Sequence, residues 1–356
     1  MPEGVLGKVP EEAHEETPAK TSVEVCEETP AKISAEVREE TPAKVHGEAH
    51  RETPAKVPEM VSLASPRATR EVLDRHGLSA KYSFGQNFLV NDAIVRKIIA
   101  LANVEPSDDI LEVGPGIGTL TRALLQHARS VLAIECDTDL LPVLGETTAA
   151  WADRFSLINM DACAFDPCLI NGEVLPSKLV SNLPYAVAAT IVLDYFERFD
   201  WLQSATVMVQ REVADRMAAK PGSKNYGAYT VKLSLFAQPA GRFAVGPGNF
   251  LPAPRVESAV LRLNRAEVTD ENGVPLSPEQ KKAVCVMADA AFANRRKTIA
   301  NSCKSYFSHD ASLGAEALMG VLADAGIDAR RRGETLTLQE FIKLGLRYYD
   351  ACAVHA

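Results

Sequence analysis

The chain has 356 residues, 46% hydrophobic and 24% charged, a composition that excludes wholesale disorder and allows two modest globular domains. Its formal net charge of −9 argues against a nucleic-acid partner, because phosphate binding needs a basic surface. Residues 1–60, however, hold 14 acids and 7 bases, which leaves 33 acids and 31 bases for residues 61–356. The body of the chain is therefore nearly neutral, and the overall charge does not exclude such a partner.

A twelve-residue repeat dominates the first part of the chain. EETPAK occurs at 15–20, 27–32 and 39–44, and RETPAK follows at 51–56. Repeats with one proline and few apolar side chains cannot bury enough surface to offset the entropy of ordering. We expect residues 1–62 to form a disordered acidic tail, and binding of a partner by the repeats stays an open alternative.

Helices and strands alternate from residue 63 onward. The pattern predicts a helix over 67–76 and another that begins at an N-cap Asp92. Five apolar, β-rich runs follow at 109–114, 130–136, 155–162, 178–183 and 204–210, separated by stretches of helix length. This order is typical of a mostly parallel sheet with crossover helices, a Rossmann-like α/β fold. Two further strands, at 232–238 and 258–263, are expected to form a hairpin at one edge.

The pattern becomes helical beyond residue 265. Ser277 with Gln280, and Thr337 with Glu340, have the spacing of capping boxes at helix starts. The polar, turn-rich stretch at 266–276 separates the two patterns. We therefore predict a catalytic domain at 63–268 and a small all-α domain at 269–356.

A glycine-rich loop follows the first predicted strand. Gly114, Gly116 and Gly118 form a GxGxG pattern, and Glu112 stands two residues before it. Glycines let the backbone approach a ligand that a Cβ atom would block. Because a carboxylate suits the cationic methionine end of S-adenosylmethionine and repels a pyrophosphate, the loop favours S-adenosylmethionine over a dinucleotide.

Two more acids stand at the ends of neighbouring strands. Glu135 ends the second predicted strand, where its carboxylate can accept hydrogen bonds from both ribose hydroxyls. Asp161 ends the third, where it can accept a hydrogen bond from the adenine amino group. Ligands of doubly wound sheets bind beyond the carboxyl ends of the strands, so these acids and the glycine loop predict one cofactor site.

The fourth predicted strand ends in Asn182-Leu183-Pro184-Tyr185. An exocyclic amine on an aromatic base is a poor nucleophile, because its lone pair is delocalised into the ring. The Asn182 oxygen and a main-chain carbonyl held by Pro184 can accept the two amine hydrogens and aim the nitrogen at a methyl sulfonium. Tyr185 offers a face on which an extruded base can stack.

At this point the sequence closely resembles the ribosomal RNA adenine dimethyltransferase family of the KsgA type, over roughly residues 68–350. The motifs that carry the resemblance are QNFL at 86–89, EVGPGIG at 112–118, NLPY at 182–185, FLPAPRVES at 250–258, NRRKT at 294–298 and RRGETL at 331–336. The resemblance implies a class I S-adenosylmethionine-dependent methyltransferase with a seven-stranded sheet. It implies dimethylation of two adjacent adenines near the 3′ end of small-subunit (16S) ribosomal RNA.

The resemblance also implies site residues. The cofactor contacts would be Asn87, Leu89, Gly114, Gly116, Glu135, Asp161 and Asn182. The catalytic positions would be Asn182, Leu183 through its carbonyl, Pro184 and Tyr185, with Phe250 on the opposite face of the base. No general base is expected, because the proton leaves an already cationic amine, and alignment is the main requirement of the transfer.

Basic residues in the last part of the chain are candidates for RNA contact. Residues 240–356 carry 15 bases and 13 acids. With the resemblance, phosphate contacts are expected at Arg295, Arg296, Lys297, Arg330, Arg331 and Arg332, with Lys220 and Lys224 near the active-site mouth. The expected partner is small-subunit ribosomal RNA within a pre-ribosomal particle, and a monomer is the expected state.

Seven cysteines without a CxxC pair suggest neither disulfides nor zinc, and no metal is expected. No uncharged run is long enough to span a bilayer, so we expect a cytoplasmic protein with no membrane partner. Three alternatives stay open: a large-subunit adenine methyltransferase conferring antibiotic resistance, a non-catalytic assembly or transcription factor, and a small-molecule or protein methyltransferase. NRRKT, RRGETL and the intact NLPY motif favour the dimethyltransferase.

Overall fold

The computed structural model describes residues 62–170, 175–309 and 314–354. The repeats at 15–56, and with them the predicted tail up to residue 61, lie outside the described residues. The described residues belong to one compact unit.

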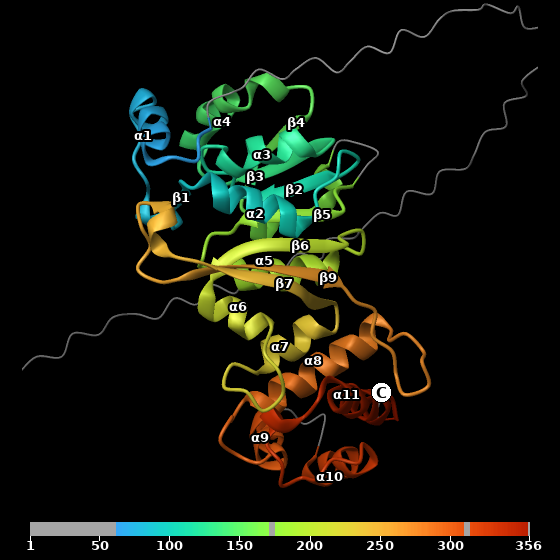
Figure 1. Cartoon of the computed structure of the whole chain (residues 1–356). Helices are drawn as coiled ribbons and strands as arrows, with labels where there is room; N and C mark the ends of the chain where they lie inside the picture. Colours follow the sequence, from blue (N-terminus) through green and yellow to red (C-terminus); the bar gives the residue numbers. More distant parts are fainter. Residues whose placement is uncertain (1–61, 171–174, 310–313, 355–356) are drawn as a thin grey trace, which may run out of the picture. The chain divides into compact units, whose positions relative to one another are not determined.

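A seven-stranded sheet forms the centre of this unit (Figure 1), in the order β4-β3-β2-β5-β6-β9-β7. Five strands pair in parallel, as predicted, and β9 pairs antiparallel with both β6 and β7. The strands are β2 (Asp109–Val113), β3 (Ser130–Glu135), β4 (Phe155–Asn159), β5 (Lys178–Asn182), β6 (Ser204–Gln210), β7 (Ala237–Val245) and β9 (Ser258–Arg265). The parallel arrangement brings the carboxyl ends of β2 to β5 to one edge.

Alternate residues of the strands pack into two separate cores, because successive side chains of a strand point to opposite faces. One face packs with helices α2 (Asp92–Ala102) and α3 (Thr119–His127) through Ile110, Val131, Val180, Met208 and Val260. The other packs with α5 (Ala188–Arg198) through Leu111, Val113, Leu179, Val207 and Leu261. Since both faces are covered by helices, the parallel strands read as nearly continuous apolar runs.

The helices of this part are α1 (Pro66–Arg75), α2 (Asp92–Ala102), α3 (Thr119–His127), α4 (Leu141–Thr147), α5 (Ala188–Arg198), α6 (Arg211–Met217) and α7 (Ala228–Ser234). The predicted cap of α2 was wrong by one residue. Asn91 is the N-cap, and its side chain accepts a hydrogen bond from the Ala93 N–H, whereas Asp92 is the first helical residue. The helix dipole stabilises the Asp92 carboxylate in the first turn. Because Asp is favourable both as the N-cap and as the first helical residue, the sequence alone does not distinguish these two positions for Asp92.

The strand predicted at 232–238 was also wrong. Residues up to Ser234 belong to α7, and β7 begins only at Ala237. The start of this run alternates partly exposed Lys232 and Ser234 with buried Leu233 and Leu235, as a half-buried strand would. Over so few residues, periodicity cannot separate a short helix from a strand. The predicted strand at 258–263 is confirmed as part of β9, which pairs with β7.

A two-stranded sheet that the sequence did not predict joins two motifs. β1 (Phe88–Leu89) pairs antiparallel with β8 (Phe250–Leu251), with Leu89 opposite Phe250. The QNFL and FLPAPRVES motifs, far apart in the chain, thus meet beside the main sheet.

The last part of the described chain is helical, as predicted. It contains α8 (Pro278–Phe292), α9 (Ile299–Tyr306), α10 (Ala315–Asp324) and α11 (Leu338–Val354). Both predicted capping boxes form: Ser277 and Gln280 exchange hydrogen bonds at the start of α8, and Thr337 and Glu340 do so at the start of α11. Buried residues of α8 and α11 join the same core as the α5 face of the sheet. The division at 268/269 stays a prediction.

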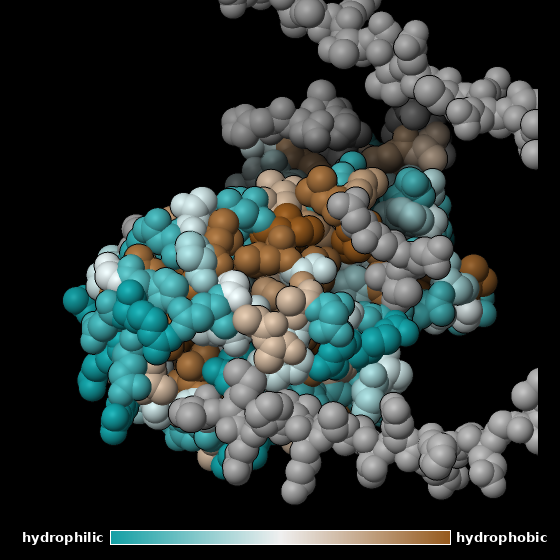
Figure 2. Space-filling model, turned by 90° about the horizontal axis from the view of Figure 1, so that it is seen from above, coloured by the Kyte–Doolittle hydropathy of each residue, from teal (hydrophilic) through white to brown (hydrophobic). Residues whose placement is uncertain are grey.

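The surface is mixed in character. The face drawn in Figure 2 gathers hydrophobic residues near its middle, with hydrophilic residues around them. None of the described helices is both long and apolar enough to cross a membrane.

Close contact between α8 and α11 depends on Gly345. A Cβ atom at this position would lie 2.6 Å from the Val284 Cα, a distance that requires one helix to shift. Gly345→Ala is therefore expected to lower the free energy of unfolding by about 2 kcal/mol, the usual cost of overpacking a core. Urea unfolding of the full chain measures this. The control is Gly320→Ala in α10, where a Cβ meets nothing within 4 Å and alanine should stabilise. Equal stabilities of the two variants would contradict the packing account.

Candidate active site

A cavity lies at the carboxyl ends of the parallel strands. Its walls come from segments 84–89, 112–117, 119–120, 134–136, 160–162 and 182–185, together with Leu140, Val187 and Ile191. All seven residues predicted for the cofactor line it: Asn87, Leu89, Gly114, Gly116, Glu135, Asp161 and Asn182. Leu183, Pro184 and Tyr185 line it as well. The structure thus brings together ten of the eleven predicted catalytic and cofactor positions, all except Phe250.

The glycine loop is fixed by close neighbours on two sides. Gly114, Gly116 and Gly118 have φ of 68°, 61° and 85°, a region that disfavours other residues. A Cβ on Gly114 would lie 3.4 Å from Pro184, and one on Gly116 would lie 3.2 Å from the Phe88 ring. The loop therefore touches both the β1 segment and the NLPY turn, and glycine leaves the cavity side open.

Glu112 is almost completely buried at the base of this loop, with 1% of its surface exposed. Its Oε2 atom has no hydrogen-bond partner among the described residues. Burial raises the pKa of Glu112 to about 8, and the nearby Glu135 carboxylate also raises it. Because Glu112 lines the cavity, a cationic ligand there would supply the missing partner and stabilise the ionised form. The residues present thus fit the cationic amino-acid end of S-adenosylmethionine.

Glu135 and Asp161 occupy the expected positions after β3 and β4. The Asp137 N–H donates to Glu135 Oε1 over 2.9 Å, and burial raises the pKa of Glu135. Asp161 is exposed, and its Oδ1 accepts from the Cys163 N–H over 2.9 Å. Backbone N–H groups thus orient both carboxylates at the cavity wall, which suits ribose and adenine recognition.

Asn182 ends β5 with its amide in a defined orientation. Its Nδ2 donates to the Asn87 carbonyl over 3.2 Å, and the Asn87 Nδ2 donates to the Gly85 carbonyl over 2.9 Å. Since only the nitrogen of an amide can donate to a carbonyl, the Oδ1 of Asn182 is the acceptor that remains. Among the described residues no group donates to it, so it is available to a ligand in the cavity.

The NLPY turn supplies a second acceptor and an aromatic ring. The Leu183 N–H donates to the Met208 carbonyl over 3.1 Å, which ties the turn to β6. Among the described residues, no group donates to the Leu183 carbonyl. The Tyr185 hydroxyl and the Ser258 Oγ are 2.6 Å apart. Burial raises the pKa of Tyr185, so the ring stays neutral. Ser258 ends the FLPAPRVES motif, and its anchoring contact was not predicted.

Phe250 lies outside the cavity wall. It belongs to β8, opposite Leu89, and is 4% exposed within the core that contains α2 and α3. The strand pairing that places it near the site also buries its ring. Stacking of Phe250 on a target base stays a prediction.

A charged network beside the cavity was not predicted from the sequence. Asp137, 3% exposed, accepts from Lys81 Nζ over 2.6 Å and from Gln86 Nε2 over 2.7 Å. Lys81 also donates to Asp139 over 2.6 Å. These partners lie 51 to 58 positions apart in the sequence, so no local pattern predicts their contact. The signal available in the sequence was the pair of acids, Asp137 and Asp139, just after the strand that ends at Glu135.

The predicted RNA contacts fall into two groups. Three arginines have acidic partners: Arg295 pairs with Glu334, Arg330 with Asp328, and Arg331 with Glu340. Arg296, Lys297, Arg332, Lys220 and Lys224 are exposed and have no ion pair among the described residues. The second group is free to contact phosphates.

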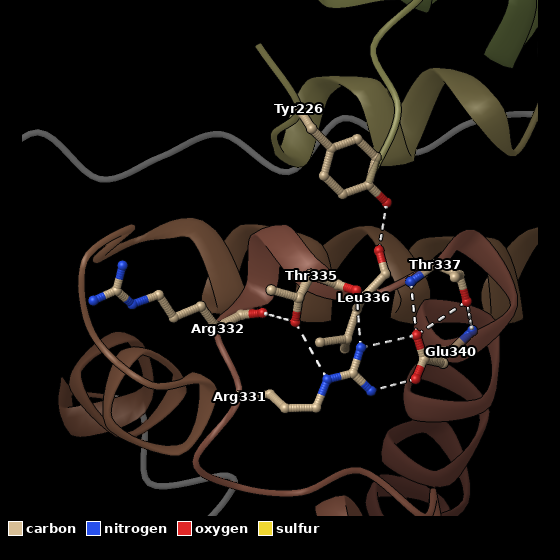
Figure 3. Close-up of polar contacts among 7 residues, drawn as sticks. All are labelled: Tyr226, Arg331, Arg332, Thr335, Leu336, Thr337 and Glu340. Carbon is tan, nitrogen blue, oxygen red and sulfur yellow. Dashed lines mark hydrogen bonds and ion pairs between the residues drawn. The ribbon is translucent and has the colours of Figure 1, made fainter. Parts of the chain in front are cut away.

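Arg331 holds a turn of the helical part (Figure 3). Its guanidinium donates to both Glu340 oxygens, to the Thr335 Oγ1 over 3.2 Å and to the Thr335 carbonyl over 2.8 Å. This pairing lowers the pKa of Glu340 to about 2. The Tyr226 hydroxyl donates to the Leu336 carbonyl from the other side, and Arg332 extends away from the group. These contacts give the Arg331 side chain a structural role, which is to hold this turn against the start of α11.

The raised pKa of Glu112 makes stability depend on pH. The folded protein keeps the Glu112 proton up to about pH 8, whereas an unfolded chain loses it near pH 4.5. The free energy of unfolding therefore falls as the pH rises from 4.5 to about 8. We expect Glu112→Gln, measured by urea unfolding of the cofactor-free chain, to gain stability over the unsubstituted protein between pH 5 and pH 8. The gain should exceed about 1 kcal/mol, because one pKa unit is worth about 1.4 kcal/mol. A difference that stays constant with pH would show that Glu112 is ionised in the folded state.

Comparisons with known proteins agree with this site. The family model "Ribosomal RNA adenine dimethylase" matches residues 77–344. The chain is 39% identical over 288 residues to the ribosomal RNA small subunit methyltransferase A of Lachnoclostridium phytofermentans, covering 80% of this chain and 97% of the relative. It is 40% identical over 287 residues to the protein of that name in Rhodococcus opacus, covering 80% and 94%.

Two solved structures share the fold. A dimethyladenosine transferase from Plasmodium falciparum has a TM-score of 0.61 at 21% identity, covering 74% of this chain and 98% of its own. The 23S rRNA methyltransferase ErmE has a TM-score of 0.53 at 23% identity, covering 74% and 100%. The predicted Rossmann-like methyltransferase fold and the S-adenosylmethionine cofactor are thereby confirmed. The chain belongs to the ribosomal RNA adenine dimethylase family.

Proposed function

We propose that this enzyme transfers methyl groups from S-adenosylmethionine to the N6 atoms of two adjacent adenines in the 3′-terminal hairpin loop of small-subunit ribosomal RNA. The observation that carries the proposal is the oriented Asn182 amide, whose Oδ1 faces no protein donor among the described residues and borders the cavity. The relatives' name, ribosomal RNA small subunit methyltransferase A, supports the choice of RNA.

The acids that line the cavity favour one orientation of the cofactor. Glu135 would hold the ribose and Asp161 the adenine. The amino-acid end would lie on the side of Glu112, whose buried Oε2 atom has no hydrogen-bond partner among the described residues. When bound there, S-adenosylmethionine supplies an electrophilic methyl group. Asn87 and Leu89 would close the cavity from the β1 segment.

The NLPY turn would prepare the nucleophile. Asn182 Oδ1 and the Leu183 carbonyl accept the two N6 hydrogens, which localises the nitrogen lone pair and directs it into the cavity. Tyr185 stacks on the base while Ser258 holds its hydroxyl, so the ring keeps one orientation. After transfer the amine is cationic and readily gives its proton to water, and no general base is needed.

Exposed cations would position the RNA. Arg296, Lys297 and Arg332 carry no ion pair within the described chain, and Lys220 and Lys224 lie on the loop whose Gly222 N–H donates to the Glu334 carbonyl over 2.7 Å. The three segments at 220–224, 295–297 and 330–334 are therefore neighbours. Phosphate contacts fix register and orientation and carry no sequence information.

We further propose that the enzyme acts as a monomer on a pre-ribosomal particle in the cytoplasm. The small-subunit name of the relatives supports a ribosomal substrate, and the described helices include none that could span a membrane.

The test supplies labelled S-adenosylmethionine with unmethylated small subunits, with large subunits or with free ribosomal RNA, and maps the methylated nucleosides. Label on two adjacent small-subunit adenines supports the proposal. Label on one large-subunit adenine would favour the antibiotic-resistance activity, and absence of transfer to all three acceptors would favour a non-catalytic factor.

Asn182→Ala should reduce kcat at least about 100-fold, the usual loss when one polar contact to a transition state is removed. Cofactor affinity, measured by calorimetry with S-adenosylhomocysteine, should change by less than tenfold, because six other predicted contacts remain. Asn272→Ala, on an exposed turn, is the matched control and should behave like the unsubstituted enzyme. Turnover retained by Asn182→Ala would refute the amine-accepting role.

Replacing Arg296, Lys297 and Arg332 together by alanine should weaken binding to small subunits and flatten its salt dependence. Each phosphate that the protein no longer neutralises should make the slope of log Kobs against log salt shallower by about 0.7 to 0.9. Arg70→Ala, an exposed cation of α1, is the control and should leave the slope unchanged. An unchanged slope in the triple variant would show that these side chains contact no phosphate.

A further inference from the structure

Two exposed aromatic rings stand on one turn, and one of them, Phe84, reaches the cavity. Tyr82 is 91% exposed and Phe84 is 41% exposed, the two ends of a single turn at Tyr82–Phe84. Phe84 also lines the cavity that holds Asn182 and Tyr185. Large aromatic side chains gain free energy from burial, so such exposure beside an active site marks a surface that a ligand covers.

The loop that carries the rings is pinned at its base. Lys81 and Gln86, at its two ends, both donate to the buried carboxylate of Asp137. The Lys81 N–H also donates to Gln86 Oε1 over 2.8 Å, and the Gly85 N–H donates to the Tyr82 carbonyl over 3.0 Å. The rings are therefore presented by a preorganised loop, which lowers the entropy cost of binding a partner.

We propose that Tyr82 and Phe84 form a stacking platform for an unpaired RNA base next to the target adenine. The proposal rests on the proposed function and extends it to a second nucleotide. The occupant follows from position and size: Phe84 lines the amine-accepting cavity, Tyr82 stands two residues away on the same turn, and each ring matches the face of one base. Bases of single-stranded loops stack on aromatic side chains in this way, independent of their identity.

The cation beside the rings is not available for a phosphate. Lys81 Nζ lies 5.5 Å from the Phe84 ring centre and donates to both Asp137 and Asp139. Tyr82 has no side-chain hydrogen-bond or ion-pair partner among the described residues, and its ring is the feature offered to a ligand. Stacking, and not charge, is thus the contribution expected from this loop.

The experiment measures binding of the 3′-terminal small-subunit hairpin, with 2-aminopurine replacing a nucleotide next to the target adenines, in the presence of S-adenosylhomocysteine. Tyr82→Ala should weaken binding about tenfold and abolish the fluorescence quenching caused by stacking. Tyr82→Phe should retain both, because the ring stacks and the hydroxyl does not. Tyr349→Ala, which removes an exposed ring on α11, is the matched control and should bind like the unsubstituted protein.

Three results would overturn the platform. Unchanged affinity and quenching in Tyr82→Ala would show that no base stacks there and that another partner covers the rings. An equal loss in Tyr82→Phe would assign the effect to the hydroxyl. A parallel loss of S-adenosylhomocysteine affinity in Tyr82→Ala would mean that the ring supports the cofactor wall instead. Methylation of small subunits by the unsubstituted enzyme, run alongside, distinguishes failure of the platform from failure of the proposed function.

Discussion

The site depends on the close contact of three backbone segments at the end of β2. Gly114 lies against Pro184, and Gly116 lies against the Phe88 ring, where a Cβ at 3.2 Å would require the ring to move by a few tenths of an ångström. The positive φ angles of the loop make this course of the backbone possible. One glycine-rich turn thereby fixes the spacing between the β1 segment, the cofactor cavity and the NLPY turn, and the Asn182–Asn87 hydrogen bond closes the same arrangement from the other side.

Electrostatics divide the molecule into two regions of different character. Acids gather where the parallel strands end, and two of them, Glu112 and Glu135, are buried at a cost that raises their pKa values. A cationic cofactor with ribose hydroxyls offsets that cost, whereas a phosphate would increase it. The exposed cations Lys220, Lys224, Arg296, Lys297 and Arg332, which have no ion pair within the described chain, lie on segments of the chain away from these acids in sequence. In the proposed function the two charges of one reaction, a sulfonium and an RNA backbone, would thus meet separate surfaces.

The five parallel strands, and the place of the glycine loop and the strand-end acids at their carboxyl ends, could be predicted because their signals are local. Apolar runs between helices, glycines after a strand and acids at strand ends each lie within a few residues. What could not be predicted depends on pairing across the chain. The β1–β8 pair joins distant parts of the sequence and buries Phe250, and Asp137 binds Lys81 and Gln86 from another segment. The basic triplets look alike in sequence, and only their neighbours show that Arg331 supports a turn while Arg332 extends away from it.

The most direct test of the central claim is the crystal structure of the enzyme with S-adenosylhomocysteine. The account predicts the ligand in the cavity between the glycine loop and the β1 segment, with its ribose hydroxyls on Glu135 and its sulfur facing Asn182 Oδ1 and the Leu183 carbonyl. A ligand bound outside this cavity, or one whose sulfur faces away from the NLPY turn, would contradict it.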